Sequence, residues 1–149
     1  MNSYQNFIND LKKMKSENKG LMSEIQYMNI GYLMNVITPC NLLVFGLGDD
    51  SFLWDKLNST GNTLFIEDDK DWIVNFKDAG LNIINVKYST FAGDHEKIGF
   101  DESILKMKLP EEVTSKSWDM VIVDGPLGHG PPGRDYKGPG RMQSIYTAH

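Results

Sequence analysis

The sequence predicts an α/β fold in which a parallel sheet has helices on both faces. From Asn41 onward, short apolar runs are separated by turn residues and by short helical patterns, as in buried parallel strands joined by helices. Because strands and helices alternate with short connections, right-handed crossovers and a doubly wound sheet are expected. A length of 149 residues suits one domain of this class.

Two helices are predicted ahead of the first strand. The first covers residues 3–19, where apolar residues recur at helical spacing. The second begins after Ser23, because Gln26 completes a capping box, and it ends before Pro39, which cannot continue a helix. We therefore expect residues 1–37 to form an N-terminal helical segment.

The doubly wound domain is expected over residues 38–149. Its predicted strands are Leu42–Phe45, Thr63–Ile66, Leu81–Val86 and Met120–Val123, and its predicted helices are Ser51–Leu57 and Lys70–Asp78. Residues 87–117 are less regular, and we expect a helix and a long surface loop there. Residues 125–140 hold 6 of the 14 glycines, which excludes a helix or a central strand. That segment is either an ordinary surface loop or, as we favour, a ligand-binding loop after a buried strand.

Charge and composition narrow the class of partner. A net charge of -5 and a pI near 5.1 oppose the basic surface typical of nucleic-acid binders, so no nucleic-acid partner is expected. The one cysteine, Cys40, cannot form an intramolecular disulfide, which fits a reducing compartment. The N-terminus has no apolar run long enough for a signal peptide or a membrane span, so we expect a cytoplasmic location and no membrane partner.

A GxG turn at the end of the first strand is the first candidate cofactor site. Small residues there let the backbone approach a ligand at the next helix N-terminus. The dinucleotide fingerprint requires a third glycine where Ser51 stands, which disfavours NAD. Asp49 and Asp50 would repel a pyrophosphate but suit the sulfonium and amino groups of S-adenosylmethionine. The cofactor-binding candidates here are Phe45, Gly46, Leu47, Gly48 and Ser51.

Two further acidic positions follow predicted strands. Glu67 ends the second strand, where a carboxylate accepts hydrogen bonds from ribose hydroxyls, and Asp68 is a cofactor-binding candidate beside it. The other interpretation of these acids is negative charge at a helix N-terminus. Asp124 and Gly125 follow the fourth strand, and a carboxylate at that edge is a candidate for cofactor contact, proton transfer or a divalent metal.

Candidates for catalysis and substrate recognition lie beyond the fourth strand. His129 is the second catalytic candidate after Asp124. Arg134, Arg141 and Tyr146 are candidates for binding an acidic or hydroxyl-rich substrate, although each also fits an ordinary surface position.

Several blocks in the same order resemble one known family. The blocks TPCN followed by LLVFGLGDDSFLWDKLN, then GNTLFIEDD with Trp72, then WDMVIVDGP and PGRMQSIYTA, are similar to the plant glucuronoxylan O-methyltransferase family, which includes irregular-xylem-type proteins of xylan biosynthesis. The resemblance covers roughly residues 38–148. It implies a Rossmann-like S-adenosylmethionine-dependent enzyme that methylates a hydroxyl of glucuronic acid on a polysaccharide. By resemblance, Gly46 and Gly48 form the cofactor turn, Glu67 binds ribose and Asp124 lies at the reaction end.

The sequence also departs from that family. The family usually has histidine at Asp49, and the loop around Gly133–Gly138 is enlarged here. The chain ends in the helix after the fourth strand, so we expect a sheet truncated after that strand, with an open edge suited to homo-oligomer formation. The alternative function is therefore a truncated, non-catalytic module that binds S-adenosylmethionine weakly or self-associates.

Overall fold

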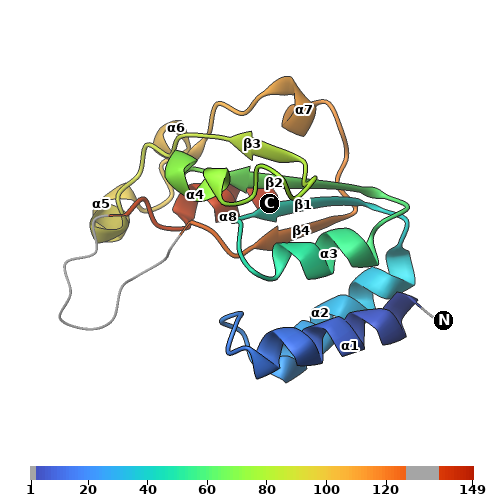
Figure 1. Cartoon of the computed structure of the whole chain (residues 1–149). Coiled ribbons are helices and arrows are strands. Elements are labelled where there is room, and N and C mark those ends of the chain that lie inside the picture. Colours follow the sequence, from blue (N-terminus) through green and yellow to red (C-terminus); the bar gives the residue numbers. More distant parts are fainter. Residues whose placement is uncertain (1–2, 127–137) are drawn as a thin grey trace.

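A four-stranded parallel sheet forms the centre of the chain in a computed structural model that describes residues 3–126 and 138–149 (Figure 1). The strands are β1 (Asn41–Phe45), β2 (Asn62–Glu67), β3 (Ile83–Asn85) and β4 (Met120–Val123), in the order β3-β2-β1-β4. The predicted α/β class with a parallel sheet is confirmed. β4 has the predicted bounds, and β1 and β2 differ from theirs by one or two residues.

β3 is shorter than the strand predicted over residues 81–86. Its ladder with β2 begins with Phe65 opposite Ile83 and ends with Glu67 opposite Asn85. β3 cannot continue past Asn85, because β2 ends at Glu67 and has no residue opposite Val86 in the ladder. At the other end, Leu81 and Asn82 lie outside the ladder although β2 extends back to Asn62.

Helices lie on both faces of the sheet. They are α1 (Ser3–Ser16), α2 (Glu24–Ile37), α3 (Ser51–Leu57), α4 (Lys70–Val74), η1 (Ala92–Asp94), α5 (His95–Ile98), α6 (Glu102–Leu105), α7 (Glu111–Thr114) and α8 (Met142–Ala148). The predicted capping box of α2 is present, with both the Ser23 and the Gln26 side chains hydrogen-bonded to backbone amides. α3 has its predicted bounds, but α4 ends earlier than Asp78 because the chain passes into turns after Val74.

Alternate residues of β1 enter two hydrophobic clusters. Leu42 and Val44 belong to the cluster that packs against α1, α2 and α3. Leu43 and Phe45 belong to the cluster on the opposite face, which includes Val113 of α7. This burial on both faces explains why β1 reads as a continuous apolar run.

The α1–α2 hairpin shares a core with the sheet. The Phe7 and Tyr27 rings lie 5.7 and 5.8 Å from the Trp54 ring of α3. A Cβ atom at Gly31 of α2 would lie only 2.3 Å from the Phe7 ring, so the two helices meet closely at that glycine. The division between residues 1–37 and residues 38–149 stays a prediction.

β4 is the terminal strand of the sheet in the described part of the chain, with α8 packed nearby (Figure 1). Self-association through this edge stays a prediction. Among residues 3–126 and 138–149, no helix is long and apolar enough to span a bilayer. His129, Arg134 and most of the predicted 125–140 loop lie outside the described residues.

Candidate functional site

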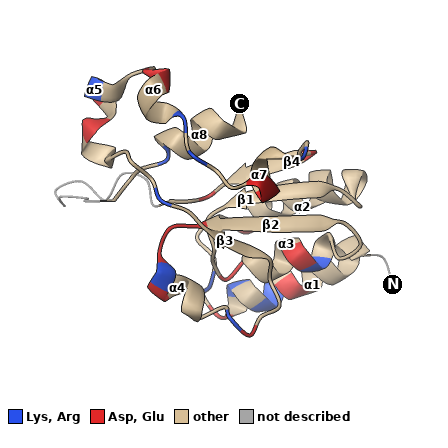
Figure 2. Ribbon diagram, turned by 90° about the horizontal axis from the view of Figure 1, so that it is seen from above, with Lys and Arg blue, Asp and Glu red and all other residues tan. Residues whose placement is uncertain are grey.

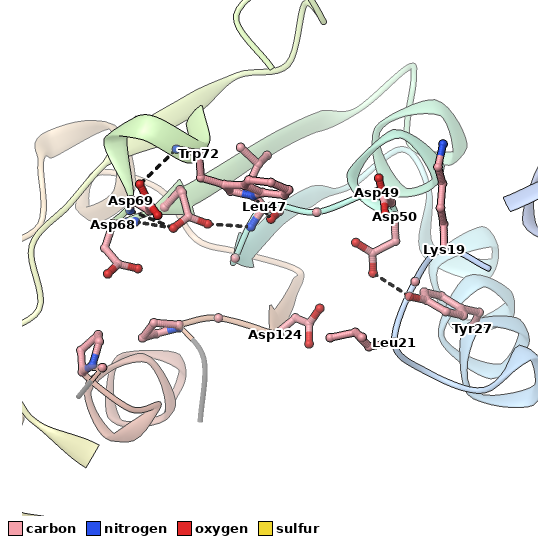
Figure 3. A pocket seen from close by; sticks show the side chains of 18 of the residues that line it. Lys19, Leu21, Tyr27, Leu47, Asp49, Asp50, Asp68, Asp69, Trp72 and Asp124 are labelled. Carbon is pink, nitrogen blue, oxygen red and sulfur yellow. Dashed lines mark hydrogen bonds between the residues drawn. The ribbon is translucent and has the colours of Figure 1, made fainter. Parts of the chain in front are cut away.

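A cavity of about 670 Å³ opens at the carboxyl ends of β1, β2 and β4 (Figure 3). The turns that follow these strands line it, together with Gly138 and Pro139. The turn between α1 and α2, from Asn18 to Leu21, also lines it. Parallel strands bring their carboxyl ends to one edge of the sheet, so blocks that are distant in the sequence meet here.

Gly46 and Gly125 lie against each other where β1 and β4 end. A Cβ atom on Gly125 would lie 2.6 Å from the Gly46 Cα, and one on Gly46 would lie 2.7 Å from the Gly125 nitrogen. Gly46 also has a φ of +112°, a conformation that favours glycine. The Asp124 and Gly125 amides both donate to the carbonyl oxygen of Phe45, which fixes the β4 exit against β1. Both glycines are therefore required by the close approach of two strand ends, whatever ligand the cavity holds.

Glu67 joins the turns that follow β1 and β2. Its Oε2 accepts a hydrogen bond from the Leu47 amide at 3.0 Å, and its Oε1 accepts from the Asp68 and Asp69 amides at 2.8 and 3.0 Å. Burial raises the pKa of this carboxyl, and the backbone amides counteract that rise. The acidic turn from β2 into α4 is red in Figure 2.

Trp72 of α4 fixes the other side of the same residue. Its indole Nε1 donates to the Leu47 carbonyl oxygen at 2.7 Å, and its ring lies over Leu47 in Figure 3. Leu47 is thus held through both its N–H and its C=O group. The GxG turn is completed by Ser51, whose buried Oγ accepts a hydrogen bond from the Gly48 amide at 3.0 Å. These contacts set the β1 turn before any ligand enters.

Asp50 is the most deeply buried of the aspartates in the cavity wall, with 7% of its surface exposed. Its Oδ2 accepts a hydrogen bond from the Tyr27 hydroxyl of α2 at 3.1 Å (Figure 3). Burial raises the pKa of Asp50, and the neighbouring charge of Asp124 raises it further. Burial and the Asp50 charge likewise raise the pKa of Tyr27.

Asp124 projects into the cavity from the end of β4 (Figure 3). Its side chain is 38% exposed, and its Oδ1 lies 3.4 Å from Nη2 of Arg141. The same guanidinium donates to the carbonyl oxygens of Asp124 and Pro126, so Arg141 braces the chain on both sides of Gly125. These contacts occupy Arg141 at the β4 exit, and substrate binding by it stays a prediction.

Negative charge dominates the described wall of the cavity. Its carboxylates are Asp49, Asp50, Glu67, Asp68, Asp69 and Asp124, whereas Lys19 is the lining cation among the described residues. Lys19 is itself ion-paired with Glu17 at 2.9 Å. Such a cavity favours a cationic ligand over a pyrophosphate. No cluster of three metal-ligating side chains occurs in residues 3–126 and 138–149.

The structure brings most of the predicted cofactor residues together. Gly46, Leu47, Gly48, Glu67, Asp68, Asp124 and Gly125 all line the cavity. Phe45 and Ser51 support it from behind through hydrogen bonds. Tyr146 lies on α8 beside Glu102, away from the cavity wall. The roles assigned to these residues stay predictions.

The N-terminal helices contribute to the cavity wall, which was not predicted from the sequence. The turn from Asn18 to Leu21 and the Tyr27 hydroxyl reach the cavity through tertiary packing, for which the local sequence has no signal. Trp72 belongs to one of the family-like blocks, but its spacing from Leu47 did not predict a hydrogen bond.

The sequence blocks that resemble a known family were compared with family models. A family model described as IRX15/IRX15L/GXM matches residues 24–103 and 95–149. The chain belongs to this family. The resemblance to glucuronoxylan O-methyltransferases seen in the sequence is thereby confirmed.

Relatives of this chain are found in Arabidopsis thaliana. Glucuronoxylan 4-O-methyltransferase 3 is 39% identical over 129 residues, covering 74% of this chain and 42% of the relative. Protein IRREGULAR XYLEM 15 is 34% identical over 131 residues, covering 74% and 39%. Arabinogalactan O-methyltransferase 2 is 33% identical over 147 residues, covering 82% and 49%. The chain therefore spans less than half the length of these relatives, and no solved structure matches it.

Proposed function

We propose that this chain binds S-adenosylmethionine and acts as an O-methyltransferase on a sugar hydroxyl, with glucuronic acid of a polysaccharide or a related glycan as the substrate class. The acidic cavity at the carboxyl ends of β1, β2 and β4 is the observation that carries the proposal. The names of the relatives, which include methyltransferases of glucuronoxylan and of arabinogalactan, support the polysaccharide substrate class.

The cavity suits the proposed cofactor in size and charge. A volume of about 670 Å³ lies within the range of roughly 300–1,000 Å³ usual for small-molecule sites. Backbone at Gly46, Gly48 and Gly125 borders the cavity, so the ligand would lie against main chain at these positions. The carboxylates complement a ligand that carries two positive groups.

The residues at the two ends of the cavity would hold different parts of the cofactor. Glu67 has Oε2 on a single amide and Oε1 on two amides, so acceptor capacity remains on Oε2 for a ribose hydroxyl, and Asp68 lies beside it. The turn formed by Gly46, Leu47 and Gly48 would contact the ligand between the two ends of the cavity.

Asp124 is the candidate catalytic base. When bound, S-adenosylmethionine supplies an electrophilic methyl group for transfer to oxygen. A sugar hydroxyl is weakly acidic, so the protein must position it and accept its proton. The Asp124 carboxylate is accessible in the cavity and oriented by Arg141 through the backbone on both sides of Gly125. A divalent metal at Asp124 and a role for His129 are secondary proposals.

A second candidate function is a non-catalytic module that binds S-adenosylmethionine weakly or self-associates. The observation that favours it is the position of β4, which is the terminal strand among the described residues and offers a main-chain edge. Such a module would bind a second chain through this edge.

Calorimetric titration with S-adenosylmethionine and S-adenosylhomocysteine, with NAD as the control ligand, tests the cofactor. Binding of the first two but not of NAD is expected. A folded chain that binds NAD alone, or that binds none of these ligands, would contradict the proposal.

Transfer of an isotopically labelled methyl group separates the two functions. Label is expected on glucuronic-acid-containing xylan and not on xylan from which the glucuronic acid has been removed. The Asp124→Asn variant should lose transfer while still binding the cofactor, with an affinity lowered by the loss of one negative charge in the cavity. Cofactor binding without transfer to any acidic glycan, together with a dimeric mass by light scattering, would favour the non-catalytic module.

A further inference from the structure

The two ends of the cavity differ in how their carboxylates are neutralised. At the β2 end, Glu67 accepts hydrogen bonds from three backbone amides. At the opposite end, Asp50 is buried to a similar extent, and in the described part of the chain it forms no ion pair. The Glu67 end is therefore suited to neutral hydroxyl groups. At the Asp50 end the nearby Lys19 is ion-paired with Glu17, so Asp50 has no cationic partner among the described residues.

The surroundings of Asp50 add negative charge instead of removing it. Asp124 faces the same space from the end of β4, and its charge raises the pKa of Asp50 (Figure 3). Hydrogen bonds from the Tyr27 and Trp54 side chains lower that pKa, but burial outweighs them. Lys19, the lysine in the cavity wall, forms its ion pair with Glu17 and not with Asp50 or Asp124. A ligand cation would relieve both the repulsion and the burial cost.

We propose that Asp50, held in place by the Tyr27 hydroxyl, binds the α-ammonium group of S-adenosylmethionine at the end of the cavity opposite Glu67. The inference rests on the proposed function and adds the orientation of the cofactor to it. The ammonium group donates to the Asp50 carboxylate, whose Oδ2 remains fixed by Tyr27 at 3.1 Å. Asp124 adds negative potential to the same space without being required as a ligand.

One consequence is a binding role for the N-terminal helices. Tyr27 lies on α2, and the α1–α2 turn covers this end of the cavity at Lys19, Gly20 and Leu21. Capping of α2 and its packing on Trp54 hold the Tyr27 hydroxyl near Asp50. Tyr27 is therefore a positioning residue, and Asp50 is the residue that contacts the ligand.

Two probe ligands isolate the amino-acid portion, which carries the ammonium group. S-adenosylhomocysteine carries it, whereas 5′-methylthioadenosine keeps the nucleoside and the sulfur but lacks the amino-acid portion. The affinity of the Asp50→Asn variant for S-adenosylhomocysteine should fall by about 10- to 100-fold, the range for a charge-assisted hydrogen bond. Its affinity for 5′-methylthioadenosine should stay within about twofold. Asp78→Asn, a charge-matched change at an exposed position outside the cavity, should alter neither affinity.

The Tyr27→Phe variant provides a second measurement that keeps the carboxylate. It should weaken S-adenosylhomocysteine binding by about 3- to 10-fold and leave 5′-methylthioadenosine binding unchanged, because it removes only the hydrogen bond that positions Asp50. Thermal unfolding by circular dichroism checks that each variant is folded.

The outcomes separate the two proposals. Wild-type chain that binds neither probe overturns the proposed cofactor and this inference with it. Wild-type chain that binds both probes, with variants that weaken both equally or neither, overturns the ammonium subsite and leaves the proposed function standing. A selective loss of S-adenosylhomocysteine affinity in both variants supports the subsite.

Discussion

Replacing Gly125 by alanine places a methyl group against the backbone of Gly46. The new Cβ atom would lie 2.6 Å from the Gly46 Cα and 2.9 Å from its nitrogen, and neither backbone atom can move as a flexible side chain would. Forced overpacking of this kind costs about 1–3 kcal/mol. We therefore expect Gly125→Ala to lower the free energy of unfolding by about that amount.

Two companion variants separate contact from backbone conformation. Gly80 has a φ of +73° and no atom within 4 Å of its ideal Cβ, so Gly80→Ala should cost only the left-handed conformation, about 1–2 kcal/mol. Gly46 combines a φ of +112° with the close contact to Gly125. Gly46→Ala should therefore cost about 2–5 kcal/mol, the sum of the two effects.

Urea unfolding followed by circular dichroism measures these differences. Gly46→Ala should lose more stability than either Gly125→Ala or Gly80→Ala. A Gly125→Ala chain as stable as the wild type would refute the close contact between the β1 and β4 ends. A Gly46→Ala loss no larger than that of Gly80→Ala would do the same.

Three further changes test individual contacts. Trp72→Phe removes the indole donor to Leu47 and should cost about 1 kcal/mol in urea unfolding; an unchanged midpoint would mean that this bond adds no stability. Ser23→Ala removes the α2 N-cap and should cost about 1 kcal/mol by the same assay, whereas no loss would contradict the capping role. Burial raises the pKa of Asp50 above its ordinary value of 3.8, so the wild type loses stability as pH rises through the raised pKa. The Asp50→Asn variant has no carboxyl to ionise there, so its free energy of unfolding relative to the wild type should be higher at neutral pH than at a pH below 3.8. A difference between the two chains that does not change with pH would contradict the burial of a charged Asp50.

The strands could be predicted because burial on both faces leaves a plain signal. β4 and β1 appear as apolar runs of strand length bounded by turn residues, and their order along the chain gives the crossovers. β3 was predicted too long: Val86 lies past the end of β2, and Leu81 and Asn82 stay outside the ladder although β2 extends back to Asn62. The end of α4 was missed because residues 75–80 continue as turns with Phe76 buried. These turns are closed by i→i−3 backbone hydrogen bonds in place of the i→i−4 bonds of an α-helix, which preserves the apolar spacing of a helix.

The cavity could be predicted in part. Glycines and carboxylates after strands identify the edge of the sheet, since parallel strands bring those positions together. Gly46 has a further reason that the sequence did not predict, because its neighbour across the strands is Gly125. Tyr27 reaches Asp50 across 23 positions of sequence through helix packing, and no spacing rule contains that contact.

The most direct test follows the glycine amides during titration with S-adenosylmethionine. In a chain labelled with ¹⁵N-glycine, the amides of Gly46, Gly48 and Gly125 border the cavity, whereas those of Gly80 and Gly99 lie away from it. Single glycine-to-alanine variants assign each signal. Binding in this cavity should shift the first three signals in a saturable manner and leave the last two in place. Saturable binding that leaves Gly46, Gly48 and Gly125 unshifted would contradict the central claim that this cavity holds the methyl donor.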